Sequence, residues 1–489
     1  MTKKDIIIVL FLFIISFIPR LYRLDNPVAD WHSWRQADTA AVSRNFIKER
    51  FNPLLPQFDS LNSLNGMSDQ NPNRYFLAEF PLYNILTYPF YKLFGVNEMY
   101  ARLVSVFFSS LTSVLLYLLV KQFSSKRSAL LAGLFFGILP FSIYYGRVIM
   151  PDPLHIFFSV LTMLLVTYWI NTSSRIWSVL AGLSYGATLL TKPYALVLIL
   201  PIAYLVFRKW GLKVFINKAS YLFFFLAFVP FLWWRWHIAA HPEGQFGTDW
   251  LFNAGNIRFT GAFFRWIIFD RMNRLVFATG GFVLFWLGLI RGRNKKEGWF
   301  YYLWLISIFI YISIIAKGNV THDYYQMPLL PIGCILMAKG FEFLLMFGNG
   351  LKQRIVNFLL AIGFVVLMLA FGWYEVRGYF NINHWEIVHA GQAADKILPV
   401  DAKVIAPYDN DSAFLYQTNR YGWTTGGLEI EKFVDRGADY LISTTLDEYT
   451  KKWIYACNIV EQSDEFVIVD LSNCNKNSES KQSEYLIGL

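Results

Sequence analysis

The sequence predicts an α-helical polytopic membrane protein with a small α/β domain at its C-terminal end. Of its 489 residues, 55% are hydrophobic and only 16% are charged, whereas about a quarter of a soluble globular chain is charged. The apolar residues form repeated long runs up to about residue 374, and the remainder is polar. The net charge of +10 then reflects basic inner loops rather than nucleic-acid binding.

Eleven apolar runs approach the roughly 20 residues that a helix needs to cross the bilayer. They are 5–24, 99–120, 129–147, 153–170, 177–191, 193–208, 219–238, 275–291, 299–316, 327–347 and 355–374. No small-residue cleavage site follows the first run, which we interpret as an uncleaved span. The stretch 81–94 is shorter and contains Pro89, which favours a helix lying at the membrane interface.

The loop charges orient this layout. Basic residues gather in every second loop, namely Lys121, Lys126, Arg127, Arg175, Arg208, Lys209, Lys213, Lys218, Arg291, Arg293, Lys295, Lys296, Lys352 and Arg354. Because such loops stay in the cytoplasm, the N-terminus is predicted inside, and eleven spans place the C-terminus outside the plasma membrane.

Two domains are predicted. Residues 1–374 form the transmembrane domain, which includes a large outer loop, 25–98, with juxtamembrane helices. A second outer segment covers about 239–274. Residues 375–489 form the extracytoplasmic α/β domain, in which 403–408, 438–444 and 465–471 are typical of strands between helical patterns. An oxidising compartment would allow a disulfide between Cys457 and Cys474.

The first outer loop opens with ADWHSWRQAD (29–38), where helical spacing puts Trp31, Trp34, Arg35 and Asp38 on one face. One interpretation is a general base at Asp38 or Asp30, with Arg35 and His32 contacting an anionic substrate. The other is an interfacial helix anchored by tryptophans, with a solvated Arg–Asp pair.

Three further outer segments carry candidate site residues. They contribute Arg147, Asp152 and His155 from RVIMPDPLHIFF (147–158), Lys192 from LLTKPY (189–194), and His322, Asp323 and Tyr324 from KGNVTHDYYQ (317–326), together with Glu79. Charge at a span end is costly unless it is solvated, paired or used. The plain alternatives are a helix-terminal role for Asp152, a snorkelling Lys192 and an aromatic belt at Tyr324.

These groups indicate the chemistry. The sequence has no Walker loop, and no cofactor is certain, although a divalent cation stays open as a cofactor. Polar groups at the outer interface fit a membrane-bound activated donor, such as a lipid-linked phosphosugar, with a carboxylate to accept a proton and cations to stabilise the departing phosphate. The alternatives are a transporter or flippase of lipid-linked glycans, which would place polar groups at midplane, and a non-catalytic assembly protein.

The order of several motifs resembles the GT-C polyprenyl-phosphate-sugar glycosyltransferases, in the branch of protein O-mannosyltransferases and aminoarabinose transferases (glycosyltransferase family 39-like). The motifs are SRNF (43–46), PLYNILTYPFYKLFG (81–95), YARLVSVFFSSLTSVLLYLL (100–119), YYGRVIMPDPLHIFF (144–158) and GLSYGATLLTKPYAL (182–196). The resemblance covers about residues 1–210 through motifs and the rest through topology.

This resemblance implies a GT-C fold and an inverting membrane glycosyltransferase. Its partners would be membrane lipid, a polyprenyl-phosphate-linked sugar donor and an acceptor (protein, lipid or glycan) on the outer face. The first-loop acid would be the base, Asp152 would line the site, and Arg102, Arg147 and Lys192 would contact the donor phosphate.

The chain departs from the family pattern at two places. The family carries an adjacent Asp-Glu pair where this chain has Arg35 and Gln36, so the base stays open between Asp38 and Asp30. The family's lysine before paired prolines is replaced by Glu79-Phe80-Pro81.

Overall fold

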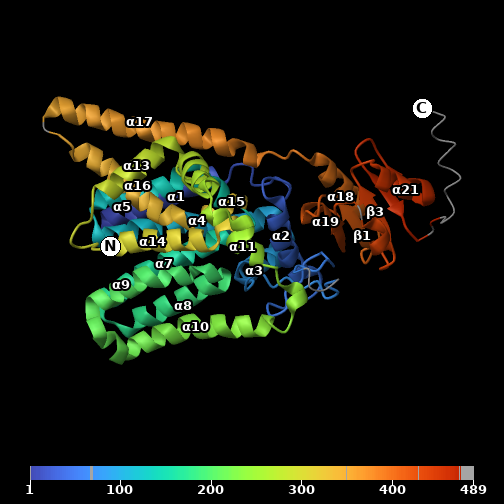
Figure 1. Cartoon of the computed structure of the whole chain (residues 1–489), viewed down its shortest axis with the longest axis horizontal. Coiled ribbons are helices and arrows are strands. Elements are labelled where there is room, and N and C mark those ends of the chain that lie inside the picture. The colour runs from blue at the N-terminus through green and yellow to red at the C-terminus, as the bar shows by residue number, and fades with distance from the viewer. Residues whose placement is uncertain (1, 66–69, 349, 428, 473, 475–489) are drawn as a thin grey trace.

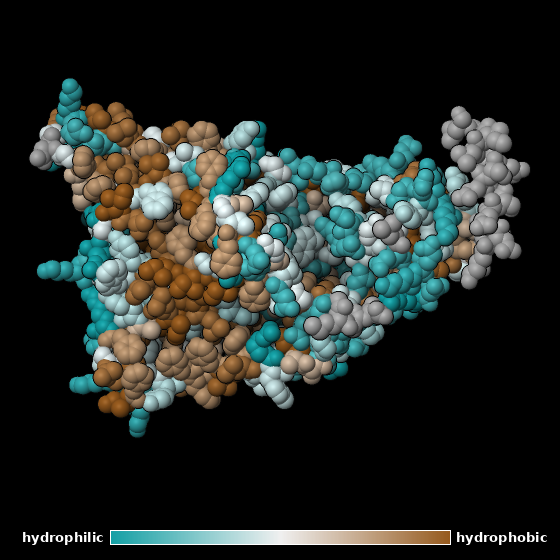
Figure 2. Space-filling view, viewed as in Figure 1, coloured by the Kyte–Doolittle hydropathy of each residue, from teal (hydrophilic) through white to brown (hydrophobic). Residues whose placement is uncertain are grey.

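A computed structural model describes residues 2–65, 70–348, 350–427, 429–472 and 474. A helical bundle fills one end of the molecule and a five-stranded sheet the other (Figure 1). Figure 2 shows hydrophobic side chains over the bundle, with hydrophilic ones over the sheet end and along the opposite extremity. This banding is what a bundle needs in order to sit in lipid between two aqueous faces.

Each predicted span overlaps one or more helices of the bundle. These helices are α1 (Lys3–Arg20), α4 (Glu98–Phe123), α5 (Lys126–Ile138), α6 (Pro140–Tyr145), α7 (Asp152–Thr172), α8 (Arg175–Thr191), η1 (Pro193–Leu198), α9 (Ile199–Trp210), η2 (Gly211–Ile216), α10 (Lys218–Ile238), α13 (Ala278–Ile290), α14 (Phe300–Ile314), α16 (Leu329–Met346) and α17 (Leu351–Val376). The segments between them hold α2 (Ser33–Lys48), α3 (Leu82–Phe94), η3 (Pro242–Gly244), α11 (Asp249–Asn253), η4 (Ala254–Phe259), α12 (Gly261–Phe264), the π-helix η5 (Arg265–Val276), α15 (Ala316–Thr321), η6 (Asp323–Gln326) and η7 (Arg377–Phe380).

Two of the predicted spans are not continuous helices. The span 129–147 breaks between α5 and α6, because Pro140 has no N–H to continue the ladder and pushes Leu139 into an extended conformation. The region of the span 275–291 is α13, which is bent by 113° from the preceding helical segment that ends at Val276.

Among the described residues, six helices are long and apolar enough to cross a membrane, or seven if the bent pair forms one span. The chain is a multi-pass membrane protein, while the count of eleven spans and the orientation of the termini stay predictions. Within the bundle, α13 packs closely on α16. A Cβ at Gly288 would lie 1.8 Å from the Leu336 carbonyl oxygen, so glycine is required there, as in close contacts between membrane helices.

The C-terminal region beyond α17 contains a mixed sheet. Its strands are β1 (Lys403–Pro407), β2 (Tyr421–Thr425), β3 (Tyr440–Ser443), β4 (Asn458–Gln462) and β5 (Val467–Asp470), and its helices are α18 (Trp385–Ile397), α19 (Ser412–Gln417), α20 (Ile430–Val434) and α21 (Glu448–Ala456). The order is β2-β1-β3-β5-β4, with β2, β1 and β3 parallel and β5 and β4 antiparallel. The three predicted strands are β1, β3 and β5. The exposed β4 and the glycine-containing β2 were not predicted.

Alternating residues of the sheet face two cores. Val404 and Ala406 pack in one core with α18, α19 and the helix α2 of the first outer loop. Ile405 and Trp423 pack in the other with α20. The first core therefore joins the C-terminal region to the first outer loop. Cys457 and Cys474 form the disulfide that the sequence left open.

Candidate functional site

Two adjoining cavities lie between the first outer loop and the rest of the molecule. One, of about 410 Å³, is lined by residues of the first outer loop, the end of α8, the end of α10, the segment 245–252 and the loop 315–325. The other, of about 770 Å³, lies between the first outer loop and the C-terminal region. Trp34 and Phe246 line both cavities. We call them the cationic cavity and the acidic cavity, after the charges described below.

The cationic cavity brings together Arg35, Glu79 and Lys192. α8 ends at Thr191, because Pro193 favours an extended conformation of the preceding Lys192, which thereby lies at the helix terminus. The Phe80 N–H donates to the Leu190 carbonyl oxygen at 3.0 Å, and this bond holds the neighbouring Glu79 beside the same terminus. Secondary structure thus fixes the positions of an acid and a base that lie more than 100 residues apart.

Arg35, Glu79 and Lys192 are linked by ion pairs, which extend to Asp152 outside the cavity lining. Arg35 forms an ion pair with Glu79, and Lys192 Nζ lies 3.9 Å from Glu79 Oε2 and 3.4 Å from Asp152 Oδ2. Asp152 is the first residue of α7 and its side chain makes no cap hydrogen bond. The carboxylate is therefore oriented towards Lys192 rather than towards its own helix.

Arg235 adds an unpaired positive charge to the cationic cavity. It lies near the C-terminal end of α10 and lines the cavity, and no salt bridge joins it to any acid of the described part of the chain. The sequence analysis missed this residue, although the signal was present: an arginine within WWRWH (233–237) stands at a predicted outer span end, where basic residues are disfavoured.

The loop 315–325 forms an aromatic wall of the cationic cavity. The His322 ring stacks on Tyr324 and Tyr325, with centroid distances of 5.4 and 6.1 Å, and lies 5.6 Å from Trp34. Burial and the neighbouring His32 lower the pKa of His322 to about 4. This histidine is neutral near pH 7 and is not a cation for phosphate.

The Asp323 carboxylate holds the loop 315–325 in place through hydrogen bonds. It accepts hydrogen bonds from Trp31 Nε1 (3.1 Å), from the Tyr379 hydroxyl (2.7 Å) and from the Tyr145 hydroxyl, and lies 2.7 Å from His32 Nε2. Burial opposes its charge, but His32 keeps the pKa of Asp323 well below its ordinary value. Asp323 and His32 line neither cavity and hold the first outer loop against the loop 315–325.

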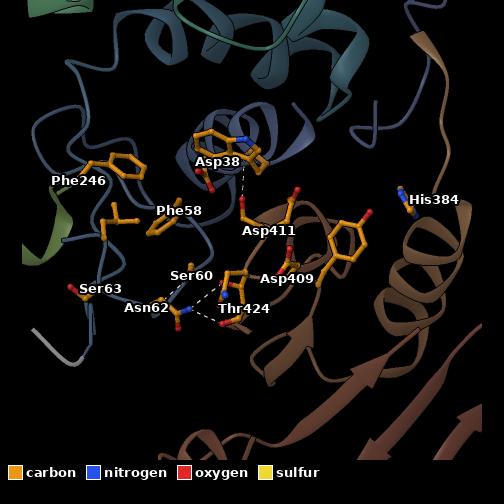
Figure 3. A pocket seen from close by; sticks show the side chains of 15 residues that line it. Asp38, Phe58, Ser60, Asn62, Ser63, Phe246, His384, Asp409, Asp411 and Thr424 are labelled. Atoms are coloured by element: carbon orange, nitrogen blue, oxygen red, sulfur yellow. Dashed lines mark hydrogen bonds between the residues drawn. The ribbon is translucent and has the colours of Figure 1, made fainter. Parts of the chain in front are cut away.

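Asp38 lies in the acidic cavity (Figure 3). Its side chain projects from α2 towards Asp411, the residue before α19. The Ser412 hydroxyl donates to the Trp34 carbonyl oxygen at 3.1 Å. Only 5% of Asp38 is exposed, and burial raises its pKa to about 7, against the opposing effects of Ser412 and Arg35. A carboxyl group that titrates near neutral pH is suited to accept and release a proton.

The other predicted site residues lie elsewhere. Asp30 is buried and accepts hydrogen bonds from Arg147 (2.7 Å) and Gln36 (2.6 Å). Arg102 donates to the carbonyl oxygens of Leu24, Asn26 and Pro27. His155 faces Thr191 within the bundle, where Nδ1 lies 3.4 Å from the hydroxyl oxygen. None of Asp30, Arg102, Arg147 and His155 lines either cavity.

The predicted four-residue stripe on one helix face is wrong at its first member. α2 begins only at Ser33, and His32 before it has a left-handed backbone with φ of 54°. This turn directs Trp31 onto the Tyr379 ring, with centroids 4.7 Å apart. Arg35 and Asp38 line different cavities, and Arg35 forms its ion pair with Glu79 rather than with Asp38.

No group of three or more His, Cys, Asp or Glu side chains in the described ranges is arranged to hold a metal ion.

Comparison with known proteins identifies the fold. The model of the dolichyl-phosphate-mannose-protein mannosyltransferase family matches residues 79–234. A search of curated proteins gives no sequence match. The crystal structure of ArnT from Cupriavidus metallidurans bound to undecaprenyl phosphate superposes with a TM-score of 0.64 at 16% identity, over 95% of this chain and 98% of that one.

A second similar structure is the oligosaccharyltransferase AglB from Archaeoglobus fulgidus in complex with an inhibitory peptide and a dolichol-phosphate. Its TM-score is 0.54 at 10% identity, over 96% of this chain and 74% of that one. The chain therefore has the GT-C fold that the sequence motifs predicted, and with it the general architecture of bundle and C-terminal region.

Proposed function

We propose that this protein is a membrane glycosyltransferase that moves a sugar from a polyprenyl-phosphate donor to an acceptor on the outer face of the membrane. The proposal rests on the two adjoining cavities on either side of Trp34, of which one contains cations and the other a buried aspartate. ArnT and AglB, which share the fold, were solved with polyprenyl phosphates bound.

The cationic cavity is assigned to the donor. Arg235 has no acidic partner among the described residues, so it can neutralise one phosphate charge directly. Lys192 supplies a second contact, because its links to Asp152 and Glu79 are long, at 3.4 and 3.9 Å, and can be exchanged for a phosphate oxygen. Tyr194, Tyr324 and Trp250 offer apolar faces with polar edges for the sugar and the first part of the lipid.

The acidic cavity is assigned to the acceptor, with Asp38 as the general base. The acceptor oxygen attacks the anomeric carbon while Asp38 takes its proton. The bond from that carbon to the phosphate oxygen breaks, and the electron pair leaves on the phosphate. Lys192 and Arg235 stabilise the charge that develops there. Asp152 and Glu79 hold Lys192 in place, and Asp30, buried against Arg147, is assigned a structural role.

The C-terminal region is assigned to the outer side. A disulfide persists in an oxidising compartment, and Cys457 and Cys474 form one. Both cavities adjoin this region or the large first outer loop, which supports our proposal that the reaction takes place at the outer interface.

The proposal is tested with purified protein and a panel of undecaprenyl-phosphate-linked sugars. We expect at least one to be consumed, with release of undecaprenyl phosphate that stops in the Asp38→Asn variant. A protein that moves such donors across proteoliposomes without cleaving them would instead be a transporter, and the proposal would be wrong.

A further inference from the structure

The acidic cavity has a lining that restricts what it can bind. Its charged residues are Asp38, Asp409 and Asp411, and the described part of its lining contains no lysine or arginine. Apart from the aliphatic Leu64, the remaining lining is aromatic or carries amides and hydroxyls, namely Trp34, Phe58, Phe246, His384, Tyr408, Ser60, Asn62, Ser63, Asn410, Ser412 and Thr424. At about 770 Å³ the cavity has the size of a ligand site.

The Asp38 carboxylate is buried and has few donors around it. It is more than nine-tenths buried and forms no ion pair with a described residue. The neighbouring Ser412 hydroxyl lowers the Asp38 pKa, but it has a single hydrogen and also lies 3.1 Å from the Trp34 carbonyl oxygen. A buried carboxylate is costly unless donors reach both of its oxygens. Figure 3 shows it directed into the cavity, opposite Asp409 and Asp411, so a molecule that enters there can supply further donors.

Building on the proposed function, we propose that the acceptor is a neutral carbohydrate chain, recognised in the acidic cavity by carboxylates of the C-terminal region. Each carboxylate accepts hydrogen bonds at two oxygens, which suits neighbouring hydroxyl groups. The aromatic rings of Trp34, Phe58 and Tyr408 supply faces for the apolar side of a sugar ring. Asp409 and Asn410 are brought into the cavity by consecutive left-handed residues, with φ of 47° and 61°.

An anionic lipid fits this cavity poorly. Phosphate groups are bound by lysine and arginine, and here three carboxylates would repel them. Burial raises the pKa of Asp411 to about 6 against a hydrogen bond from the Ala413 N–H, and the nearby charge of Asp409 adds a smaller increase.

An extended peptide is disfavoured by the sheet edge. Peptides often bind by adding a strand to an exposed edge. The edge strand nearest the cavity is β2, and the first outer loop already occupies it: the Leu61 N–H donates to the Gly422 carbonyl oxygen at 2.7 Å, and the Gly422 N–H to the Asp59 carbonyl oxygen at 3.0 Å. Asn62 extends this contact through a 2.7 Å hydrogen bond to the Thr424 carbonyl oxygen. A hydroxyl-rich chain does not need that edge.

The test uses the full-length protein in lipid nanodiscs, screened for binding to an array of neutral and anionic oligosaccharides, to serine- and threonine-containing peptides, and to phosphatidylglycerol vesicles. We expect binding to neutral oligosaccharides alone. Asp409→Asn, which keeps a residue tolerant of left-handed backbone, should weaken that binding by about tenfold or more, as the loss of a charged hydrogen-bond acceptor implies. Asp411→Asn, which still caps α19, should weaken it too. The exposed Asp401→Asn serves as the matched control and should leave it unchanged.

Preference for peptides or anionic vesicles, absence of binding to every neutral oligosaccharide, or equal binding by Asp409→Asn and the native protein would each overturn the inference. A parallel arm measures the binding of undecaprenyl phosphate to the native protein and to Lys192→Ala. If undecaprenyl phosphate does not bind the native protein while neutral oligosaccharides do, the proposed donor site fails and the carbohydrate site stands. If it binds and the oligosaccharides do not, the reverse holds.

Discussion

Replacing Asp38 by Asn should have opposite effects on activity and on stability. The pKa of Asp38 is raised to about 7 by burial, about 3 pH units above an ordinary aspartate, and each pH unit corresponds to about 1.4 kcal/mol. In the unfolded chain the carboxyl group ionises near pH 4, and in the folded chain only near pH 7. Between these values ionisation favours the unfolded state, so native stability falls by up to about 4 kcal/mol as pH rises.

Asparagine is neutral at every pH and escapes this loss. At pH 4 the variant and the native protein should therefore melt at similar temperatures, and at pH 8 the variant should melt several degrees higher. In the transfer assay the variant should be inactive, while the native rate should rise with pH up to about 7 and then level off, because only the ionised carboxylate accepts a proton. Thermal unfolding in detergent at pH 4, 6 and 8, with Asp401→Asn as the control, measures the first effect.

Two results would refute this reasoning. One is a melting difference between Asp38→Asn and the native protein that does not change with pH, which would mean that the aspartate titrates as an ordinary surface acid. The other is a variant that melts lower at pH 8 and also loses activity, because Asp38 would then stabilise the fold as a charged group.

The other structural assignments give three further expectations. Asp30→Asn leaves Arg147 buried without its ion-pair partner and should cost roughly 3–5 kcal/mol of stability, which is measured as a lower melting temperature. A variant as stable as the native protein would contradict the structural role of Asp30. Arg235→Gln should weaken undecaprenyl phosphate binding by roughly 10- to 100-fold, since a charge-assisted hydrogen bond is worth about 1.5–3 kcal/mol. The control variant Arg377→Gln replaces an exposed arginine that lines neither cavity and should bind like the native protein. Equal affinities of the two variants would remove Arg235 from the donor site. Gly422→Ala would place a Cβ 1.8 Å from the Val404 carbonyl oxygen. The substitution should destabilise the junction of β1, β2 and the first outer loop by roughly 1–3 kcal/mol or more and speed proteolysis of that region. Unchanged proteolysis would show that the junction can shift.

The sequence predicted the elements that depend on local pattern. The apolar runs located the bundle helices, and alternating apolar residues located β1, β3 and β5. The motif order led to the GT-C fold. The lysine at the end of α8 was recognised as a candidate because a basic residue at an outer span end needs a reason, and it does line a cavity. The same rule applied to Arg235 would have found it.

Features that depend on tertiary contacts were not predictable. Nothing local distinguishes Asp30, which is enclosed by Arg102 of α4 and Arg147 of the segment between α6 and α7, from Asp38, which opens into a cavity. The division of Arg35 and Asp38 between two cavities arises because the segment around Phe80 is bound to the end of α8 and the C-terminal region covers the next turn of α2. The strand β2 has few apolar residues and is completed by the first outer loop, which no local pattern reveals.

The central claim is that donor and acceptor occupy the two cavities on either side of Trp34. A cryo-EM structure of the protein with undecaprenyl phosphate tests it most directly. We predict phosphate density within hydrogen-bond distance of Lys192 and Arg235, with Asp38 facing it across Trp34 from an open acidic cavity. Phosphate density among the carboxylates of the acidic cavity, or on a surface away from both cavities, would contradict the account.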